Sequence, residues 1–119
     1  MKKTIADLVN FAASAAPNET YPTPAEKCVQ GSPMQNATTH YAVDDKFAAG
    51  EWESEVGRWR VDYSEHEYFE ILSGHSVLYD DAGNSMELKA GDRVCVPAGF
   101  SGEWEVIEPT RKVFVIYEP

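Results

Sequence analysis

Four residues that could bind a metal ion or transfer a proton lie close together near the middle of the chain. They are Asp62, Glu65, His66 and Glu67, within the stretch VDYSEHEYFEIL. Carboxylates and imidazoles serve both as ligands of divalent metals and as general acids or bases. If this stretch is a β-strand, however, the side chains of His66 and Glu67 point to opposite faces, so the adjacent pair cannot serve one site.

The remaining histidines and cysteines do not supply the missing ligands. His40 precedes Asp62 by 22 residues, and His75 follows the turn glycine Gly74 near the end of a predicted strand. Cys28 and Cys95 have neither a CxxC nor a zinc-site spacing. Cys95 stands between two valines, which is typical of a buried apolar thiol. Two isolated cysteines favour a reducing, cytoplasmic compartment over a disulfide scaffold.

Short strands separated by turns are predicted to position these residues. From about residue 38 onward, runs such as TTHYAV, RWRVDY and RKVFVIYE alternate with turn sequences such as DAGN. Many short strands at this spacing predict an all-β sandwich or barrel. Long helical stretches do not separate the strands, so a parallel α/β sheet is not expected.

The chain is predicted to divide into an N-terminal segment, residues 1–37, and a barrel, residues 38–119. Thr4 and Asp7 have the spacing of a capping box, which favours a short helix over a signal peptide. The apolar residues that would share one face of this helix are Ile5, Leu8, Val9 and Ala12. Residues 16–36 are rich in polar residues and proline, so we expect them to wrap the barrel or reach a neighbouring subunit.

The charge balance excludes some classes of partner. The net charge is −10 over 119 residues, and such an acidic surface repels phosphate backbones and anionic lipids. We therefore expect neither a nucleic-acid nor a membrane partner. The acidic residues are scattered along the chain, which is typical of a solvated surface.

Two stretches of the sequence resemble the cupin superfamily. They are GEWESEVGRWRVDYSEHEYFEILSG (residues 50–74) and GDRVCVPAGFSGEWEVIEPTRKVFVIYE (residues 91–118). The resemblance is to the short single-domain cupin-3 (DUF861) type, which is similar to the cupin domains of ureidoglycine aminohydrolase and of ethanolamine-utilisation proteins. It implies an all-β double-stranded β-helix, or jelly-roll barrel, preceded here by the short N-terminal helix. It implies little about the reaction, because cupins include several kinds of enzyme as well as binding proteins.

The first cupin motif lacks its metal-binding histidines in this chain. Counting back from the glycine that closes the motif gives Glu67 at the glutamate position. The two histidine positions then fall on Val61 and Tyr63, or on Arg60 and Asp62 in the alternative register. Neither register contains an imidazole.

The second motif lacks its ligand as well. Its histidine position is Gly102, and the position of an expected asparagine is Val106. One remaining carboxylate does not hold a divalent ion well, because such sites need three or four converging donors. We therefore expect a barrel without metal or cofactor, although Asp62 and Glu65 leave a site made of oxygen donors open.

Strand alternation predicts which side chains face the interior. If Glu67 points inward, so does Phe69, and Trp59 shares a face with the two histidine positions. The predicted ligand-binding residues are Trp59, Val61, Phe69, Gly102 and Trp104. The alternative is that the aromatic residues simply fill a small barrel.

Glu67 and Tyr63 are the candidate catalytic residues. A buried carboxylate with no cation beside it has a raised pKa, which suits a general acid or base. Tyr63 would hydrogen-bond to the ligand or to Glu67. Arg58 and Arg60 alternate with Trp59, so we expect both to point outward and to pair with carboxylates.

Three functions follow from these residues and from the resemblance. The first is a protein that binds a small polar metabolite in an aromatic-lined pocket without a metal, with or without catalysis by Glu67. The second is a metal-dependent aminohydrolase of amines or ureides, which the counted ligands oppose. The third is a non-catalytic module with a closed core. In each case the resemblance implies a homodimer that forms through sheet faces and exchanged N-terminal segments.

Overall fold

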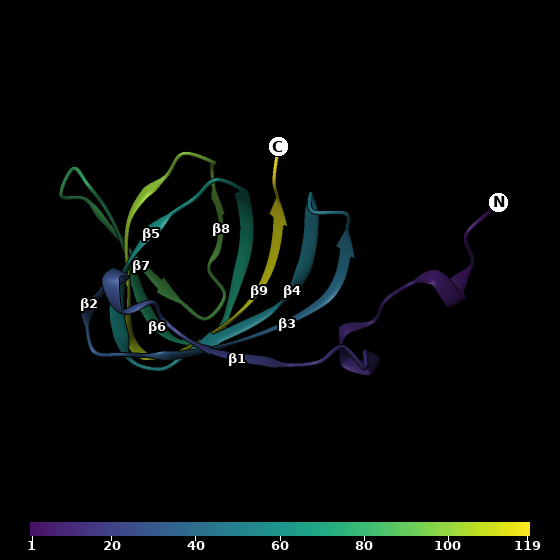
Figure 1. Cartoon of the computed structure of the whole chain (residues 1–119), viewed down its shortest axis with the longest axis horizontal. Coiled ribbons are helices and arrows are strands. Elements are labelled where there is room, and N and C mark those ends of the chain that lie inside the picture. Colours follow the sequence, from purple (N-terminus) through teal and green to yellow (C-terminus); the bar gives the residue numbers. More distant parts are fainter.

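Antiparallel β-strands make up most of the computed structural model, which describes residues 1–119 (Figure 1). The helical elements are three short 3-10 turns: η1 (Ile5–Asp7), η2 (Phe11–Ala13) and η3 (Ala25–Lys27). The strands are β1 (Glu19–Pro22), β2 (Cys28–Gln30), β3 (Met34–Val43), β4 (Phe47–Ser54), β5 (Gly57–Asp62), β6 (His66–Asp80), β7 (Ser85–Lys89), β8 (Arg93–Val96) and β9 (Ser101–Tyr117).

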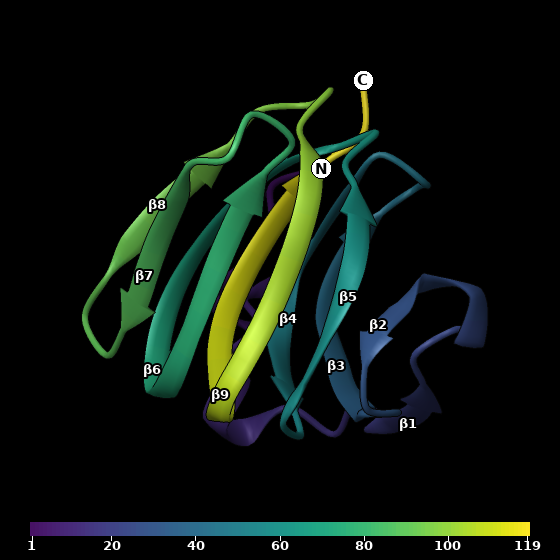
Figure 2. The ribbon, with the colours of Figure 1, turned by 90° about the vertical axis from the view of Figure 1, so that its left-hand side faces the viewer.

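The two longest strands, β6 and β9, run through both layers of the barrel. The first half of β6 pairs with β8 and with the second half of β9, which continues to β4, β3 and β1. The second half of β6 pairs with β7 and with the first half of β9, which continues to β5 and β2. Figure 2 shows these strands side by side. The arrangement is the jelly-roll barrel that the sequence predicts, and the all-β fold class is confirmed.

A glycine permits the corner at which β6 passes from one layer to the other. Gly74 has a φ of 93°, a backbone conformation that residues with a Cβ rarely adopt. A Cβ at this position would also collide with the carbonyl oxygen of Pro109, on the neighbouring strand β9. The tight turn of the paired strands therefore depends on this residue.

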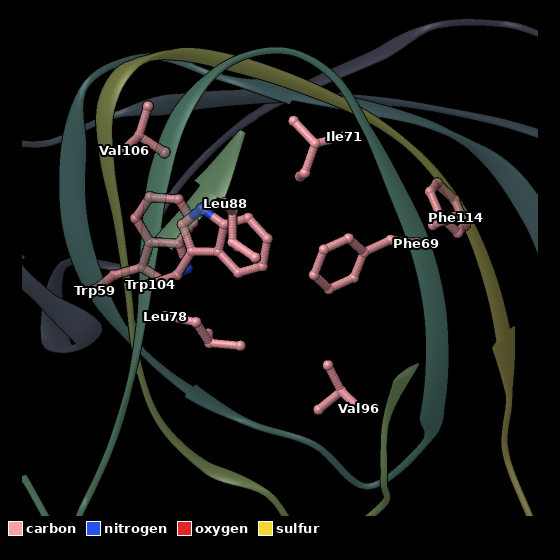
Figure 3. Packing of buried hydrophobic residues seen from close by; sticks show 9 residues of the cluster. All are labelled: Trp59, Phe69, Ile71, Leu78, Leu88, Val96, Trp104, Val106 and Phe114. Carbon is pink, nitrogen blue, oxygen red and sulfur yellow. The ribbon is translucent and has the colours of Figure 1, made fainter. Parts of the chain in front are cut away.

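The hydrophobic core lies between the two layers (Figure 3). Strands β5 to β9 supply its residues, and β6 and β9 contribute alternate ones such as Phe69 and Ile71, as expected when one face of a sheet is buried. Trp104 and Phe69 are at the centre, with their ring centroids 5.5 Å apart. The other members of the cluster are Trp59, Ile71, Leu78, Leu88, Val96, Val106 and Phe114.

The N-terminal residues do not form the amphipathic helix that the sequence predicts. The capping box is present, because the Thr4 amide donates to Asp7 at 2.7 Å. It starts only a single 3-10 turn, η1, and Ile5 and Leu8 are 83% and 67% exposed. Such a short helix is unstable in water unless its apolar face packs on something, and here this segment extends away from the barrel (Figure 1). No helix in the chain is long and apolar enough to span a membrane.

Candidate functional site

A cavity of about 350 Å³ opens between β5, the start of β6, the end of β9 and the segment around residues 21–27. Four of the seven predicted catalytic and ligand-binding residues line it: Trp59, Val61, Tyr63 and Glu67. Three of these positions alternate along β5 and just beyond it, so their side chains share one face of the strand. The structure thus brings together both candidate catalytic residues and two of the five predicted ligand-binding residues.

The other three predicted ligand-binding residues lie outside the cavity lining. Phe69 and Trp104 are 0% and 2% exposed and belong to the core beneath the cavity. Gly102 lies where β9 runs between β5 and β6, and a Cβ there would collide with the carbonyl oxygen of Tyr79. The glycine is therefore needed for the close approach of two strands.

Glu67 is not the lone buried acid that the sequence predicts, because Lys112 lies beside it. The Lys112 Nζ atom is 2.9 Å from Oε2 of Glu67, and the two side chains are only 8% and 6% exposed. Lys112 alternates with Phe114 and Ile116 along β9, and all three line the cavity. The same alternation is visible in the sequence RKVFVIYE, so Lys112 could have been placed inside by the rule that placed Phe69.

Aromatic rings enclose the ammonium group of Lys112. Its Nζ atom lies 4.8 Å from the ring centroids of Trp52 and Phe69 and 4.6 Å from that of Trp104. A cation over the faces of aromatic rings is attracted by their negative π-systems, most strongly where water is excluded. The ammonium of Lys112 therefore has both a charged partner, Glu67, and an aromatic surrounding.

Tyr63 lies beside the ion pair as a hydrogen-bond donor. Burial raises the pKa of Tyr63, and the negative charges of Glu67 and Glu65 raise it further. Backbone hydrogen bonds hold the residue in place, because its amide donates to Phe100 at 2.9 Å and its carbonyl accepts from Gly99 at 2.7 Å. The phenol stays protonated at neutral pH, so it can donate to a ligand but cannot act as a base.

The segment before β3 forms one wall of the cavity, which the sequence did not indicate. Trp52 Nε1 donates to Gln35 Oε1 at 2.9 Å, and Gln35 Nε2 donates to Thr23 Oγ1 at 2.7 Å. Thr23 in turn donates to the carbonyl oxygen of Pro33 at 2.8 Å. Thr23 and Gln35 are both buried, so this chain of hydrogen bonds fixes the wall.

Arg60 and Asp62 line the cavity and are joined through Ser101. Arg60 donates to Asp81 at 2.7 Å and to Ser101 at 2.8 Å, and Ser101 donates to Asp62 at 2.8 Å. On the same strand, Arg58 Nε is 2.6 Å from Glu103. The prediction that the two arginines pair with carboxylates is confirmed, although Arg60 also borders the cavity.

The residues present do not fit the metal ion that cupin motifs bind. Val61 and Gly102 offer no donor, and the charge of Glu67 is already compensated by Lys112. No group of three or more His, Cys, Asp or Glu side chains could hold a metal ion. His66 points away from Glu67: its ring stacks on Tyr117, and its Nδ1 accepts from the Ala98 amide at 3.1 Å.

Comparison with protein families settles the membership of this chain. The family described as the EutQ-like cupin domain matches residues 42–114. The chain belongs to this family. The matched residues include β5, β6 and most of β9, so the cupin domain contains Glu67, Tyr63 and Lys112.

Solved structures similar to this cupin domain share its fold. A DUF861 family protein of unknown function from Pseudomonas syringae has a TM-score of 0.76 at 19% identity, over 87% of this chain and 45% of that chain. The EutQ protein of Clostridium difficile has a TM-score of 0.66 at 15% identity, over 82% of this chain and 74% of that one. A DUF861 family protein from Thermotoga maritima is 33% identical over 54% of this chain and 73% of that one, with a TM-score of 0.53. The chain thus spans less than half the length of the Pseudomonas protein, and no curated protein matches it.

Proposed function

We propose that this cupin domain binds a small polar metabolite without net charge, and that it does so without a metal ion. The observation that carries the proposal is the open cavity of about 350 Å³ with the Glu67–Lys112 ion pair at its wall. Small-molecule sites are typically apolar clefts with a few convergent polar groups. Trp59, Trp52 and Phe114 supply the apolar surface here, and the ion pair and Tyr63 supply the polar groups.

The charges that line the cavity favour a ligand without net charge. Three acidic side chains, those of Asp62, Glu65 and Glu67, are matched by three basic ones, those of Lys27, Arg60 and Lys112. A ligand of either sign would lie beside like charges as well as opposite ones. The volume lies near the lower limit of about 300–1,000 Å³ for small-molecule sites, which suits a metabolite rather than a peptide or a nucleotide.

The cavity also offers the groups for proton transfer. The carboxylate of Glu67 lies at the cavity wall beside Lys112, where it acts as the base in a reaction of the bound ligand. Tyr63, which stays protonated, donates a hydrogen bond to the ligand. Glu67→Gln would then abolish any turnover found for a bound compound, and an unchanged rate would remove Glu67 from this role.

The two alternative functions have less support. The aminohydrolase alternative needs a metal ion, and the side chains present do not fit one. The closed-core alternative needs the aromatic residues to fill the barrel, whereas Trp59 borders an open cavity. A homodimer in the cytoplasm stays part of the proposal, and the exposed side chains of Ile5, Leu8 and Val9 on the extended N-terminal segment favour it.

A thermal-shift screen tests the binding proposal. Amines, ureides, sugars and small acids are added to the wild-type protein and to Glu67→Gln, with Glu87→Gln as the control because Glu87 lies on β7 outside the cavity. We expect uncharged polar compounds to raise the melting temperature, since a ligand at 100 times its Kd stabilises by about 2.7 kcal/mol. The shift should persist in the control and shrink in Glu67→Gln. A screen without a hit, or an equal shift in both variants, would contradict the proposal.

A further inference from the structure

We propose that Lys112 is a built-in cation that takes the place of a metal ion in this pocket and binds an oxygen atom of the ligand. The first half of this inference, that Lys112 takes the place of a metal ion, concerns the protein alone. The second half, that Lys112 binds an oxygen atom of the ligand, rests on the proposed function, because it requires that a ligand enters the cavity.

The position of Lys112 is the first argument. It lines the same cavity as Val61, Tyr63 and Glu67, which are three of the four metal-ligand positions in the first register counted for the cupin motifs. The glutamate is retained, and a positive charge lies 2.9 Å from its Oε2 atom. The pocket therefore has a cation beside the glutamate, supplied by β9 of the chain itself.

The fixed geometry of Lys112 is the second argument. Lysines on a protein surface have flexible side chains, but this side chain is 8% exposed and lies among three aromatic rings. Removing one partner of a buried ion pair leaves an uncompensated charge, which is strongly unfavourable. Lys112 is thus held at one place in the cavity, as a bound ion would be.

The unused hydrogen-bond capacity of the ammonium is the third argument. A lysine ammonium has three N–H donors, and the one carboxylate oxygen paired with it, Oε2 of Glu67, can occupy only one of them. Because Lys112 borders the cavity, the others can reach an acceptor on a ligand. A neutral carbonyl or hydroxyl oxygen fits this place better than a carboxylate, which the adjacent Glu67 would repel.

The same ion pair explains why a divalent metal is not expected here. A metal ion bound to Glu67 would lie beside the ammonium of Lys112, and like charges at such distances repel strongly in a buried site. Adding Mn²⁺ or Zn²⁺ to the wild-type protein should leave its melting temperature unchanged.

Chemical rescue tests the built-in cation without any knowledge of the ligand. Lys112→Ala removes three methylene groups and the amine, which are the atoms of n-propylammonium. We expect the melting temperature of Lys112→Ala to be lower than that of the wild type and to rise with n-propylammonium chloride until the site is saturated. Equal concentrations of n-propanol, or of sodium chloride, should not raise it, and Glu67→Gln/Lys112→Ala should not respond to the amine.

A second pair of variants keeps the test decisive if Lys112→Ala does not fold. Lys112→Met preserves much of the side-chain volume without the charge, and we expect it to be less stable than Glu67→Gln/Lys112→Met because it leaves the carboxylate alone. Three results would overturn the first half of the inference. They are equal rescue of Lys112→Ala by n-propanol, no rescue of folded Lys112→Ala by the amine, and a double variant Glu67→Gln/Lys112→Met that is less stable than Lys112→Met. A saturable gain of stability with Mn²⁺ or Zn²⁺ that Glu67→Gln abolishes would overturn it as well.

The second half is tested with the best compound from the thermal-shift screen. Lys112→Met should weaken its binding at least tenfold, whereas Lys89→Met, at an exposed lysine on β7, should leave it unchanged. Unchanged binding in Lys112→Met would overturn the second half. Successful amine rescue together with a screen without hits would overturn the proposed function and leave the built-in cation standing.

Discussion

Val61 and Gly102 lie directly opposite each other on strands β5 and β9. Gly102 is the histidine position of the second cupin motif and Val61 is one in the first register counted for the first motif, and neither side chain carries a donor atom. Gly102 is also paired with Asp80 of β6, and a Cβ at this position would collide with the carbonyl oxygen of Tyr79. The strand packing therefore excludes any side chain at Gly102, a histidine included.

Gly102→Ala should destabilise the protein by about 3 kcal/mol, because the overpacking is against backbone that cannot move aside. Urea unfolding measures the loss. Gly83→Ala is the matched control: Gly83 has a φ of 87° but no atom within 4 Å of its missing Cβ. That change should cost only about 1 kcal/mol of backbone strain. Equal losses of stability in the two variants would show that β9 does not approach β6 tightly at Gly102.

Tyr63 should make the protein sensitive to alkaline pH. Its pKa in the folded protein is above the ordinary value of 10.0 because of burial and the charge of Glu67. The unfolded chain therefore releases this proton first, so the stabilising contribution is present below about pH 10 and is lost as the pH rises above it. Urea unfolding between pH 8 and 11 should show a steeper loss for the wild type than for Tyr63→Phe.

The exposed Tyr41 provides the control for the alkaline experiment. Tyr41→Phe should follow the wild-type curve more closely than Tyr63→Phe does, because the Tyr41 side chain is 44% exposed. If Tyr63→Phe also follows the wild-type curve, Tyr63 ionises as freely in the folded protein as in the unfolded chain, and its assignment as a permanent donor is wrong.

The sequence predicted the barrel because its signals are local and repeated. Alternating apolar runs separated by turn residues fix the strands and their inward faces. The N-terminal helix was predicted from the same kind of local pattern, but only short 3-10 turns form there, and Ile5 and Leu8 stay exposed. Periodicity shows which face is apolar, but not whether a partner surface exists.

The candidate site could be predicted only in part, for a related reason. Alternation placed Glu67 and Tyr63 inside, and both line the cavity. Lys112 is 45 residues away from Glu67 in the sequence, and only the pairing of β6 with β9 brings them together. A lysine in a strand is also usually read as a solvent-facing residue. Alternation could have placed Lys112 inside the barrel, but its position beside Glu67 became visible only with the register of the strands.

Arg58 should contribute nothing to ligand binding although it neighbours Trp59. Its guanidinium lies over the Tyr79 ring, 4.1 Å from the centroid, and pairs with Glu103 on the outer face of the barrel. Arg58→Gln should leave the thermal shifts of the screened compounds unchanged and cost at most about 1 kcal/mol of stability, as for exposed ion pairs. If Arg58→Gln abolishes the thermal shift, the ligand binds on the outer face of β5 and not in the cavity.

Ser76 should be the residue that fixes Trp104 in the core below the cavity. Its hydroxyl lies 2.7 Å from that of Thr110 and accepts from Trp104 Nε1 at 3.2 Å, and all three residues are buried. Ser76→Ala leaves the indole N–H and the threonine hydroxyl with one partner fewer, so it should cost about 1–3 kcal/mol in urea unfolding. Ser85→Ala, at an exposed position of β7, should cost little stability. Because Trp104 Nε1 is occupied by Ser76, ligands should bind equally well to Ser76→Ala at temperatures where it is folded. Weaker binding would instead mean that the indole N–H turns toward the cavity and belongs to the site.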